Sequence, residues 1–136
     1  MDRKKRSAEA EIRVLIERWA SAVQRQDIAM IVADHATNFL MFDVPPPNAL
    51  EGIDAYRESW LPFFKHFRHG GVFAIDRLDI TAGDHVAFAT ALLRCGTDED
   101  FDRDPTNRLR LTVGLRKEDD RWVIAHEHHS FPSKPV

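Results

Sequence analysis

The chain has 136 residues, of which 43% are hydrophobic and 30% charged, and its formal net charge at pH 7 is −3. These values are ordinary for one water-soluble domain with a buried core. The weak negative net charge gives no indication of nucleic-acid binding. No apolar run is long enough to cross a bilayer, and no signal-peptide core follows the basic start. A single cysteine, Cys95, fits a reducing compartment. We therefore expect a cytoplasmic protein with neither a nucleic-acid partner nor a membrane partner.

Two helices are predicted in the first part of the chain. Apolar residues recur at 3.6-residue spacing through the first helix, which we place at residues 8–25 with Ser7 as its N-cap. Residues 1–7 would then form a flexible tail. Asp27 is expected to cap a short second helix over residues 28–33.

A strand and a third helix come next. Residues 38–42 predict a strand that ends at Asp43, and a stiff proline-rich loop at 44–48 follows it. Gly52 begins the third helix, which has a strong aromatic face. Pro62 lies inside this helix and should kink or split it.

The rest of the chain is predicted to be β-structure. Four strands are expected, at residues 72–81, 85–95, 108–117 and 121–132, with an acidic loop at 96–105. Helices early in the chain and antiparallel strands late indicate an α+β fold. In this fold a curved antiparallel sheet wraps on three N-terminal helices.

The last predicted strand is apolar at its start and polar at its end. Simple alternation places two sets of side chains on opposite faces: Ala125, Glu127 and His129 on one, and Trp122, Ile124, His126 and His128 on the other. Polar groups on such an apolar strand must find partners or face a wet cavity. We therefore expect the C-terminal half of this strand to line a polar pocket.

The local sequence contains two candidates for a functional site, one for metal binding and one for catalysis. His126 and His128 share a face at a spacing that zinc or iron can use, but Glu127 points away from them. Strand histidines are more often bonded to neighbours, so we expect no metal and no cofactor. Asp43 follows an apolar strand, where a carboxylate could act as a general base. The alternative is a turn-initiating aspartate before Val-Pro.

Several of these features together resemble one superfamily. They are the element order, Asp27-Ile28, Asp43, Gly52, and the ending Trp122…His126-Glu127-His128-His129-Ser130-x-Pro132. The chain resembles SnoaL-like and ketosteroid-isomerase-related proteins, which share the cone-shaped α+β barrel of nuclear transport factor two. The resemblance covers residues 8–132, implying one domain with tails at 1–7 and 133–136. The strand ending is also similar to the association domain of calcium/calmodulin-dependent kinase, a non-catalytic assembly module.

The resemblance implies small-molecule binding, with isomerase- or cyclase-like acid–base chemistry on an apolar carbonyl compound. The alternative is a non-catalytic ligand-binding or oligomerisation module. By this resemblance, Asp43 corresponds in position to the isomerase's general-base aspartate, and Trp19 corresponds to the tyrosine that stabilises the oxyanion. The isomerase's protonated aspartate corresponds in position to Thr112 or Val113. In this interpretation Asp43 abstracts a proton, and His129 or Trp19 stabilises the oxyanion.

The expected pocket lies between the sheet and the three helices. Its predicted catalytic residues are Asp43 and His129, and its predicted lining residues are Trp19, Phe39, Tyr56, Trp60, Phe64, Arg110, Thr112 and Glu127. His129 with Arg94 and Arg110 could form a positive floor. The sequence does not decide which face of the 108–117 strand points into the pocket, although alternation favours the face that carries leucine and valine. The strands at 85–95 and 108–117 carry more apolar residues than one layer of helices can cover. This excess predicts that a second copy of the chain covers the rest, in a homodimer.

Overall fold

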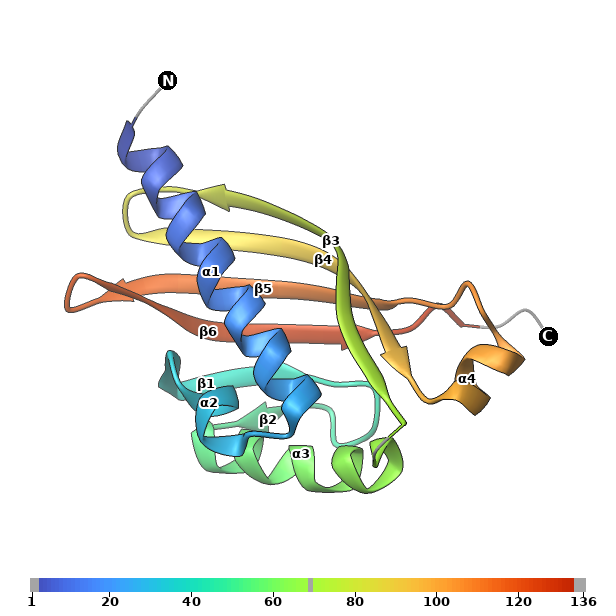
Figure 1. Ribbon diagram of the computed structural model, residues 1–136. Helices are drawn as coiled ribbons and strands as arrows, with labels where there is room; N and C mark the ends of the chain where they lie inside the picture. Colours follow the sequence, from blue (N-terminus) through green and yellow to red (C-terminus); the bar gives the residue numbers. More distant parts are fainter. Residues whose placement is uncertain (1–2, 69, 134–136) are drawn as a thin grey trace.

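The computed structural model describes residues 3–68 and 70–133 (Figure 1). In chain order, the helices and strands of these residues are α1 (Arg3–Arg25), α2 (Ile28–Val32), β1 (His35–Phe42), β2 (Leu50–Glu51), α3 (Ile53–Phe67), β3 (Val72–Ala82), β4 (Val86–Gly96), α4 (Asp98–Arg103), β5 (Leu109–Glu118) and β6 (Arg121–Ser130). Of the two predicted tails, residues 1–2 and 134–136 lie outside the described residues. Within the described ranges, no helix is both long and apolar enough to cross a bilayer.

One curved sheet and the helices that cover one of its faces make up the molecule. The six strands have the order β2-β1-β6-β5-β4-β3, and β3 to β6 form an antiparallel meander. Helix α1 crosses the sheet, while α2 and α3 lie at the end that carries β1 and β2 (Figure 1). The predicted α+β class is therefore confirmed. The sheet does not close, and it is not wholly antiparallel, because β1 runs parallel to β6.

A β-bulge in β6 decides which of its side chains face the core. Leu115 pairs with Ile124, whereas the preceding residue Gly114 pairs with His126, so Ala125 is an extra residue in β6. The alternation of side chains shifts by one at this point. The inward-facing residues are Trp122, Ile124, Glu127 and His129, all at most 6% exposed. The predicted grouping of side chains on this strand was wrong, because simple alternation assumes an unbroken ladder.

Strand β5 has the alternation that the sequence predicted. Its inward residues Leu109, Leu111, Val113 and Leu115 are 2–3% exposed. The side chains between them lie on the outer face of the sheet. The question left open by the sequence is thus settled in favour of the Leu/Val face.

Two helices differ from prediction, one because of local helix propensity and the other because of packing against the core. Helix α1 begins at Arg3 and continues through Ser7, so Ser7 is not its N-cap and residues 3–7 are helical. This segment contains neither glycine nor proline, and lysine and arginine favour helix formation. Helix α3 also continues through Pro62 without splitting. Buried residues on both sides of the proline, Trp60 and Phe67, anchor it to the core.

Helix α4 replaces part of the predicted acidic loop. The Thr97 hydroxyl accepts a hydrogen bond from the Asp100 backbone N–H (3.3 Å), and the Asp100 carboxylate accepts one from the Thr97 N–H (2.9 Å). This reciprocal capping box satisfies two N–H groups that a helix start leaves unpaired. A carboxylate-rich first turn also suits the positive end of the helix dipole.

Candidate functional site

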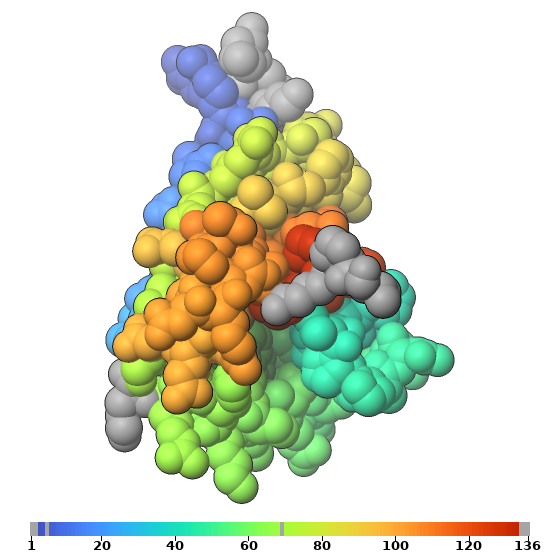
Figure 2. Space-filling view, turned by 90° about the vertical axis from the view of Figure 1, so that its right-hand side faces the viewer, coloured from blue at the N-terminus to red at the C-terminus, as the bar shows by residue number. Residues whose placement is uncertain are grey.

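A cavity of about 800 Å3 lies among α3, the loop after β1, and the segment around α4. These three parts of the chain meet on the face shown in Figure 2. The lining is mainly apolar. Its aromatic members are Trp60, Phe63, Phe67, Phe73 and Phe131, and the prolines at 45–47 add a rigid wall. A space of this size, shape and chemistry is typical of a small-molecule site.

Asp43 and His129, the two predicted catalytic residues, both line this cavity. Asp43 follows β1 and is partly exposed, and its Oδ1 accepts a hydrogen bond from the Val44 N–H at 2.7 Å. That bond joins neighbouring residues, whereas an aspartate that initiates a turn accepts from the N–H two residues on, and Pro45 at that position has no N–H. Because Asp43 lines the cavity, its carboxylate is accessible from the cavity.

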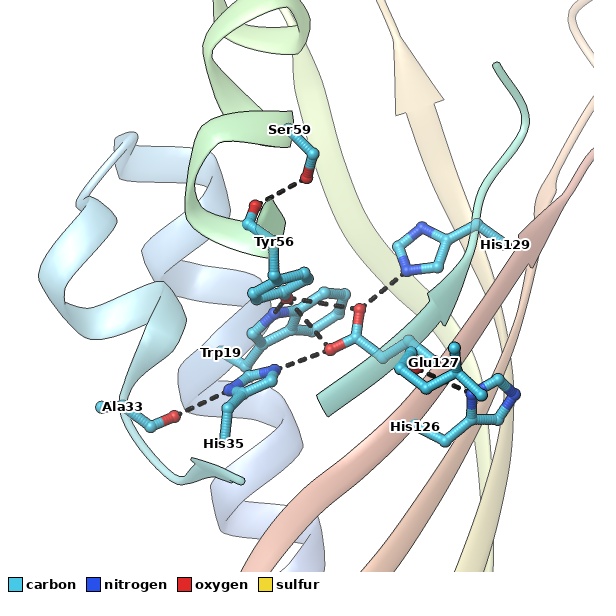
Figure 3. Close-up of polar contacts among 9 residues, drawn as sticks. Trp19, Ala33, His35, Tyr56, Ser59, His126, Glu127 and His129 are labelled. Carbon is cyan, nitrogen blue, oxygen red and sulfur yellow. Dashed lines mark hydrogen bonds and ion pairs between the residues drawn. The ribbon is translucent and has the colours of Figure 1, made fainter. Parts of the chain in front are cut away.

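Behind His129 lies a fully buried carboxylate, that of Glu127 (Figure 3). Three side chains point towards it. His129 Nε2 lies 2.8 Å from Oε1, His35 Nε2 lies 2.7 Å from Oε2, and the Tyr56 hydroxyl lies 3.0 Å from Oε2. A buried charge is tolerated only where it is paired and hydrogen-bonded, and this cluster meets that condition.

The hydrogen bonds around Tyr56 give the network a direction. The Trp19 indole N–H can only donate, and it donates to the Tyr56 oxygen at 2.8 Å. The Tyr56 hydroxyl therefore donates its own hydrogen to Glu127. Burial and the nearby Glu127 charge raise the pKa of Tyr56 well above 10.0, which keeps this hydroxyl protonated.

Burial and pairing act in opposite directions on the two groups nearest the cavity. Burial disfavours the Glu127 charge, but hydrogen bonds from His129 and His35 outweigh it and lower the pKa of Glu127 from 4.5 to about 2. Burial also disfavours a charged His129. The hydrogen bond and charge of Glu127, with a contribution from Asp43, nevertheless raise the pKa of His129 above 6.5. We conclude that an ion pair lies at the inner end of the cavity.

The other predicted pocket residues fall into three groups. Trp60 lines the cavity. Phe64 is half-buried and stacks on Trp60, with ring centroids 6.0 Å apart. The remaining inward residues lie in the core behind the cavity and do not line it: Trp19, Phe39, Tyr56 and Glu127.

Two predicted lining residues, Arg110 and Thr112, are on the wrong side of the sheet. Both are exposed on the outer face of β5. Arg110 bonds Ser130 there, and Arg94 forms an ion pair with Asp76, so the predicted positive floor does not exist. The prediction failed because the apolar face of β5 fills the interior.

The predicted oxyanion role of Trp19 is also contradicted. Its N–H is committed to Tyr56, and the side chain is only 3% exposed. Of the two positions weighed for the isomerase's aspartate, the inward one is Val113, which is paired with Glu127 across the sheet. An apolar residue thus occupies that position, and among the described residues His129 is the buried polar side chain that lines the cavity.

Sequence reasoning missed His35, which is 92 residues from Glu127 in the chain. No local pattern marks it, because its role depends on β1 lying beside β6. His126 and His128 do share the outer face, and His126 Nδ1 donates to the Leu40 carbonyl at 2.8 Å. Among the described residues, no group of three or more histidine, cysteine or acidic side chains is arranged to hold a metal ion.

The curved sheet and its helical cover define a cystatin-like α+β fold of the kind found in nuclear transport factor two. A family model for the SnoaL-like domain matches residues 12–134. The chain therefore belongs to the SnoaL-like domain family. No curated protein sequence matches the chain significantly.

Comparison with solved structures identifies the same fold. An NTF2-like protein of unknown function from Pseudomonas putida KT2440 is 35% identical with a TM-score of 0.84, and the match covers 94% of this chain and 89% of that one. A protein with a cystatin-like fold from Caulobacter vibrioides is 14% identical (TM-score 0.74; 92% and 89% covered). A protein from Shewanella frigidimarina NCIMB 400, provisionally described as a ketosteroid isomerase, is 18% identical (TM-score 0.67; 85% and 91% covered). The last two similarities show the fold alone.

The buried carboxylate generates a stability prediction. Glu127→Leu keeps most of the volume but leaves the donors of His35, His129 and Tyr56 without their acceptor. We expect the free energy of unfolding at pH 6 to fall by about 3–5 kcal/mol in urea titrations. Glu127→Gln should cost less than half of this, because an amide can accept from one histidine and donate to the other. A loss below about 1 kcal/mol for Glu127→Leu, matching the exposed control Glu17→Leu, would contradict the central role of this carboxylate.

The two shifted pKa values also predict how stability changes with pH. The pKa of Glu127 is lowered on folding, so its contribution is full above pH 4.5 and is lost as the pH falls towards 2. The pKa of His129 is raised, so its contribution is full below pH 6.5 and is lost as the pH rises through the folded-state value. Thermal unfolding from pH 5 to 9 should show stability falling above pH 6.5. His129→Gln should flatten this alkaline decline, whereas the exposed neighbour variant His128→Gln should retain it.

Proposed function

We propose that this protein binds an apolar small molecule with a carbonyl group in the cavity and catalyses an isomerase- or cyclase-type proton transfer on it. The observation that carries the proposal is that Asp43 and His129 line one cavity whose other walls are largely apolar. The provisional description of the Shewanella protein as a ketosteroid isomerase is consistent with this chemistry.

The proposed reaction assigns one role to each residue. Asp43 forms an ion pair with none of the described cations, so its carboxylate is free to accept a proton. It takes the proton from the carbon next to the carbonyl, and the electrons of that C–H bond move to the carbonyl oxygen. His129 donates a hydrogen bond to this developing oxyanion. Return of the proton to another carbon would complete an isomerisation.

The alternative is a non-catalytic ligand-binding module. It is favoured by one observation: the donors of Trp19 and Tyr56 are directed into the Glu127 network and not into the cavity. Among the described residues that line the cavity, His129 and Trp60, whose indole N–H has no partner, then remain as buried donors. Binding without turnover would be the signature of this second function.

The enzymatic proposal is tested with 2-tetralone, an apolar ketone with acidic α-protons. We expect the protein to accelerate exchange of these protons in D2O at pH 7, followed by NMR. Asp43→Asn should reduce the acceleration by about 10²-fold or more, and His129→Gln by about 10²-fold, the usual losses for a general base and an oxyanion donor.

Matched variants separate chemistry from general damage. Asp54→Asn changes an exposed carboxylate on α3, and His128→Gln changes an exposed histidine on β6, so both should exchange like the parent protein. If 2-tetralone shifts the melting temperature of the parent but its exchange is not accelerated, the module function is correct. Absence of both effects across a panel of apolar ketones would refute the proposed ligand class.

We further propose that the outer face of the sheet joins two copies of the chain. Four exposed apolar side chains lie on this face: Phe42 (36%), Val86 (66%), Phe88 (52%) and Leu92 (37%). Val86, Phe88 and Leu92 lie along β4, whereas Phe42 on β1 is separated from them by β5 and β6. Exposed apolar side chains gathered along one strand favour an interface there. A second copy of the chain is the partner that presents the same apolar surface in return.

The cytoplasmic location stays a prediction.

Light scattering at micromolar concentration tests the dimer. The parent should have twice the mass of one chain, and Phe88→Lys should convert it to a monomer, because a buried lysine would lack a partner. The control Val14→Lys changes an apolar side chain of similar exposure (56%) on α1 and should stay dimeric. A monomeric parent would remove the interface.

A further inference from the structure

His35 has two hydrogen-bond partners that both accept. Its Nδ1 lies 3.0 Å from the carbonyl oxygen of Ala33, and its Nε2 lies 2.7 Å from Glu127 Oε2. A carbonyl oxygen only accepts, so Nδ1 carries a hydrogen. An ionised Glu127 also only accepts, so Nε2 carries one as well. The side chain is fully buried, and with a hydrogen on each nitrogen it would be a second cation beside the carboxylate.

We propose that His35 is a positioning residue for His129 and acts through the Glu127 carboxylate that both histidines contact. Through this carboxylate, His35 determines which nitrogen of His129 exchanges a proton with the cavity. It also prevents His129 from being held permanently as the counter-ion of Glu127. His35 does not line the cavity and cannot touch a ligand there. Its effect on the cavity therefore passes through the shared carboxylate.

The first part of the argument concerns the tautomer of His129. His35 donates to Oε2, and the Tyr56 hydroxyl lies nearer to Oε2 (3.0 Å) than to Oε1 (3.3 Å), which keeps the carboxylate ionised and leaves Oε1 able to accept from His129. His129 Nε2 lies 2.8 Å from Oε1 and must then carry a hydrogen in every protonation state. The nitrogen that gains and loses a proton is consequently Nδ1, which has no hydrogen-bond partner among the described residues.

The second part concerns charge. The titratable groups that face His129 are Glu127 on its own strand, Asp43 at the end of β1, and, across the carboxylate, His35 and Tyr56. The nearby rings of Trp19, Trp60 and Phe73 carry no charge. Without the positive charge of His35, the whole negative charge of Glu127 would be balanced by His129. Its proton would then be held more tightly and would be less available to a ligand.

The consequence deepens the proposed function and rests on it. A fixed Nε2–H tautomer presents Nδ1 to the inner end of the cavity. When protonated it binds a ligand oxygen, and when neutral it accepts a proton. The same site can then recognise both the ketone and its oxyanion.

The parent protein provides the first test. Long-range 1H–15N correlation spectra of the histidine rings, recorded from pH 5 to 9, distinguish protonated from unprotonated nitrogens. We expect both nitrogens of His35 to stay protonated at pH 7, and His129 to titrate at Nδ1 while Nε2 keeps its hydrogen. A neutral His35 with one protonated nitrogen at pH 7, or titration of His129 at Nε2, would overturn the proposal.

The second test uses His35→Gln, which can still donate a hydrogen bond to Glu127 but carries no charge. The apparent pKa of His129 should rise by about one unit or more, because one of two cations near the same carboxylate has been removed. The control His126→Gln removes another partly buried histidine that bonds a backbone carbonyl, and should leave the titration of His129 unchanged. An unchanged or lowered value in His35→Gln would show that His35 is only structural. If this variant does not fold, the spectra of the parent decide.

The two proposals can fail separately. If 2-tetralone neither binds nor exchanges but the NMR titrations behave as described, the positioning role of His35 stands and the proposed function is wrong. If 2-tetralone exchanges in the parent while His35→Gln leaves the titration of His129 unchanged, the function stands and the role of His35 is wrong.

Discussion

The rest of the structure depends on one buried carboxylate. Glu127 is removed from water, and a lone carboxylate there would cost several kcal/mol. Its partners come from separate parts of the fold: His35 from β1, Tyr56 from α3 and His129 from β6. Trp19 on α1 completes the set through Tyr56. The sheet and two helices are thereby connected at one point, and each partner's orientation is set by the same charge.

The bulge at Ala125 is what allows β6 to support both a core and a site. On the N-terminal side of the bulge the strand buries Trp122 and Ile124, and on the C-terminal side it buries Glu127 and His129 on the same face. Without the extra residue, one of these pairs would face outward. The apolar half packs against the helices, while the polar half ends at the cavity. A local irregularity of the backbone thus places the Glu127–His129 pair at the inner end of a largely apolar cavity.

Loops and helices supply many of the residues that line the cavity. The proline-rich loop, the second half of α3 and the short helix α4 surround it, and His66 on α3 bonds Asp100 of α4 at 3.1 Å. Fold membership does not by itself determine the ligand. In this chain the cavity carries a carboxylate, Asp43, near its proline-rich wall and an imidazole, His129, backed by Glu127.

The sequence by itself determined what depends on short-range periodicity. The 3.6-residue pattern of α1, the alternation of β5 and the α+β order follow from which side chains can be buried together. The polar end of an apolar strand predicted a polar pocket there, and the resemblance to the SnoaL-like family pointed to Glu127 and His129 as its cavity-facing residues. The role of His35 and the parallel pairing of β1 with β6 were decided only by the tertiary structure, because they depend on contacts between residues about 90 positions apart. The bulge at Ala125 likewise depends on strand register, and it reversed the predicted facing of half of β6. Arg110 and Thr112 were misplaced for the related reason that only packing shows which face of a sheet encloses a cavity.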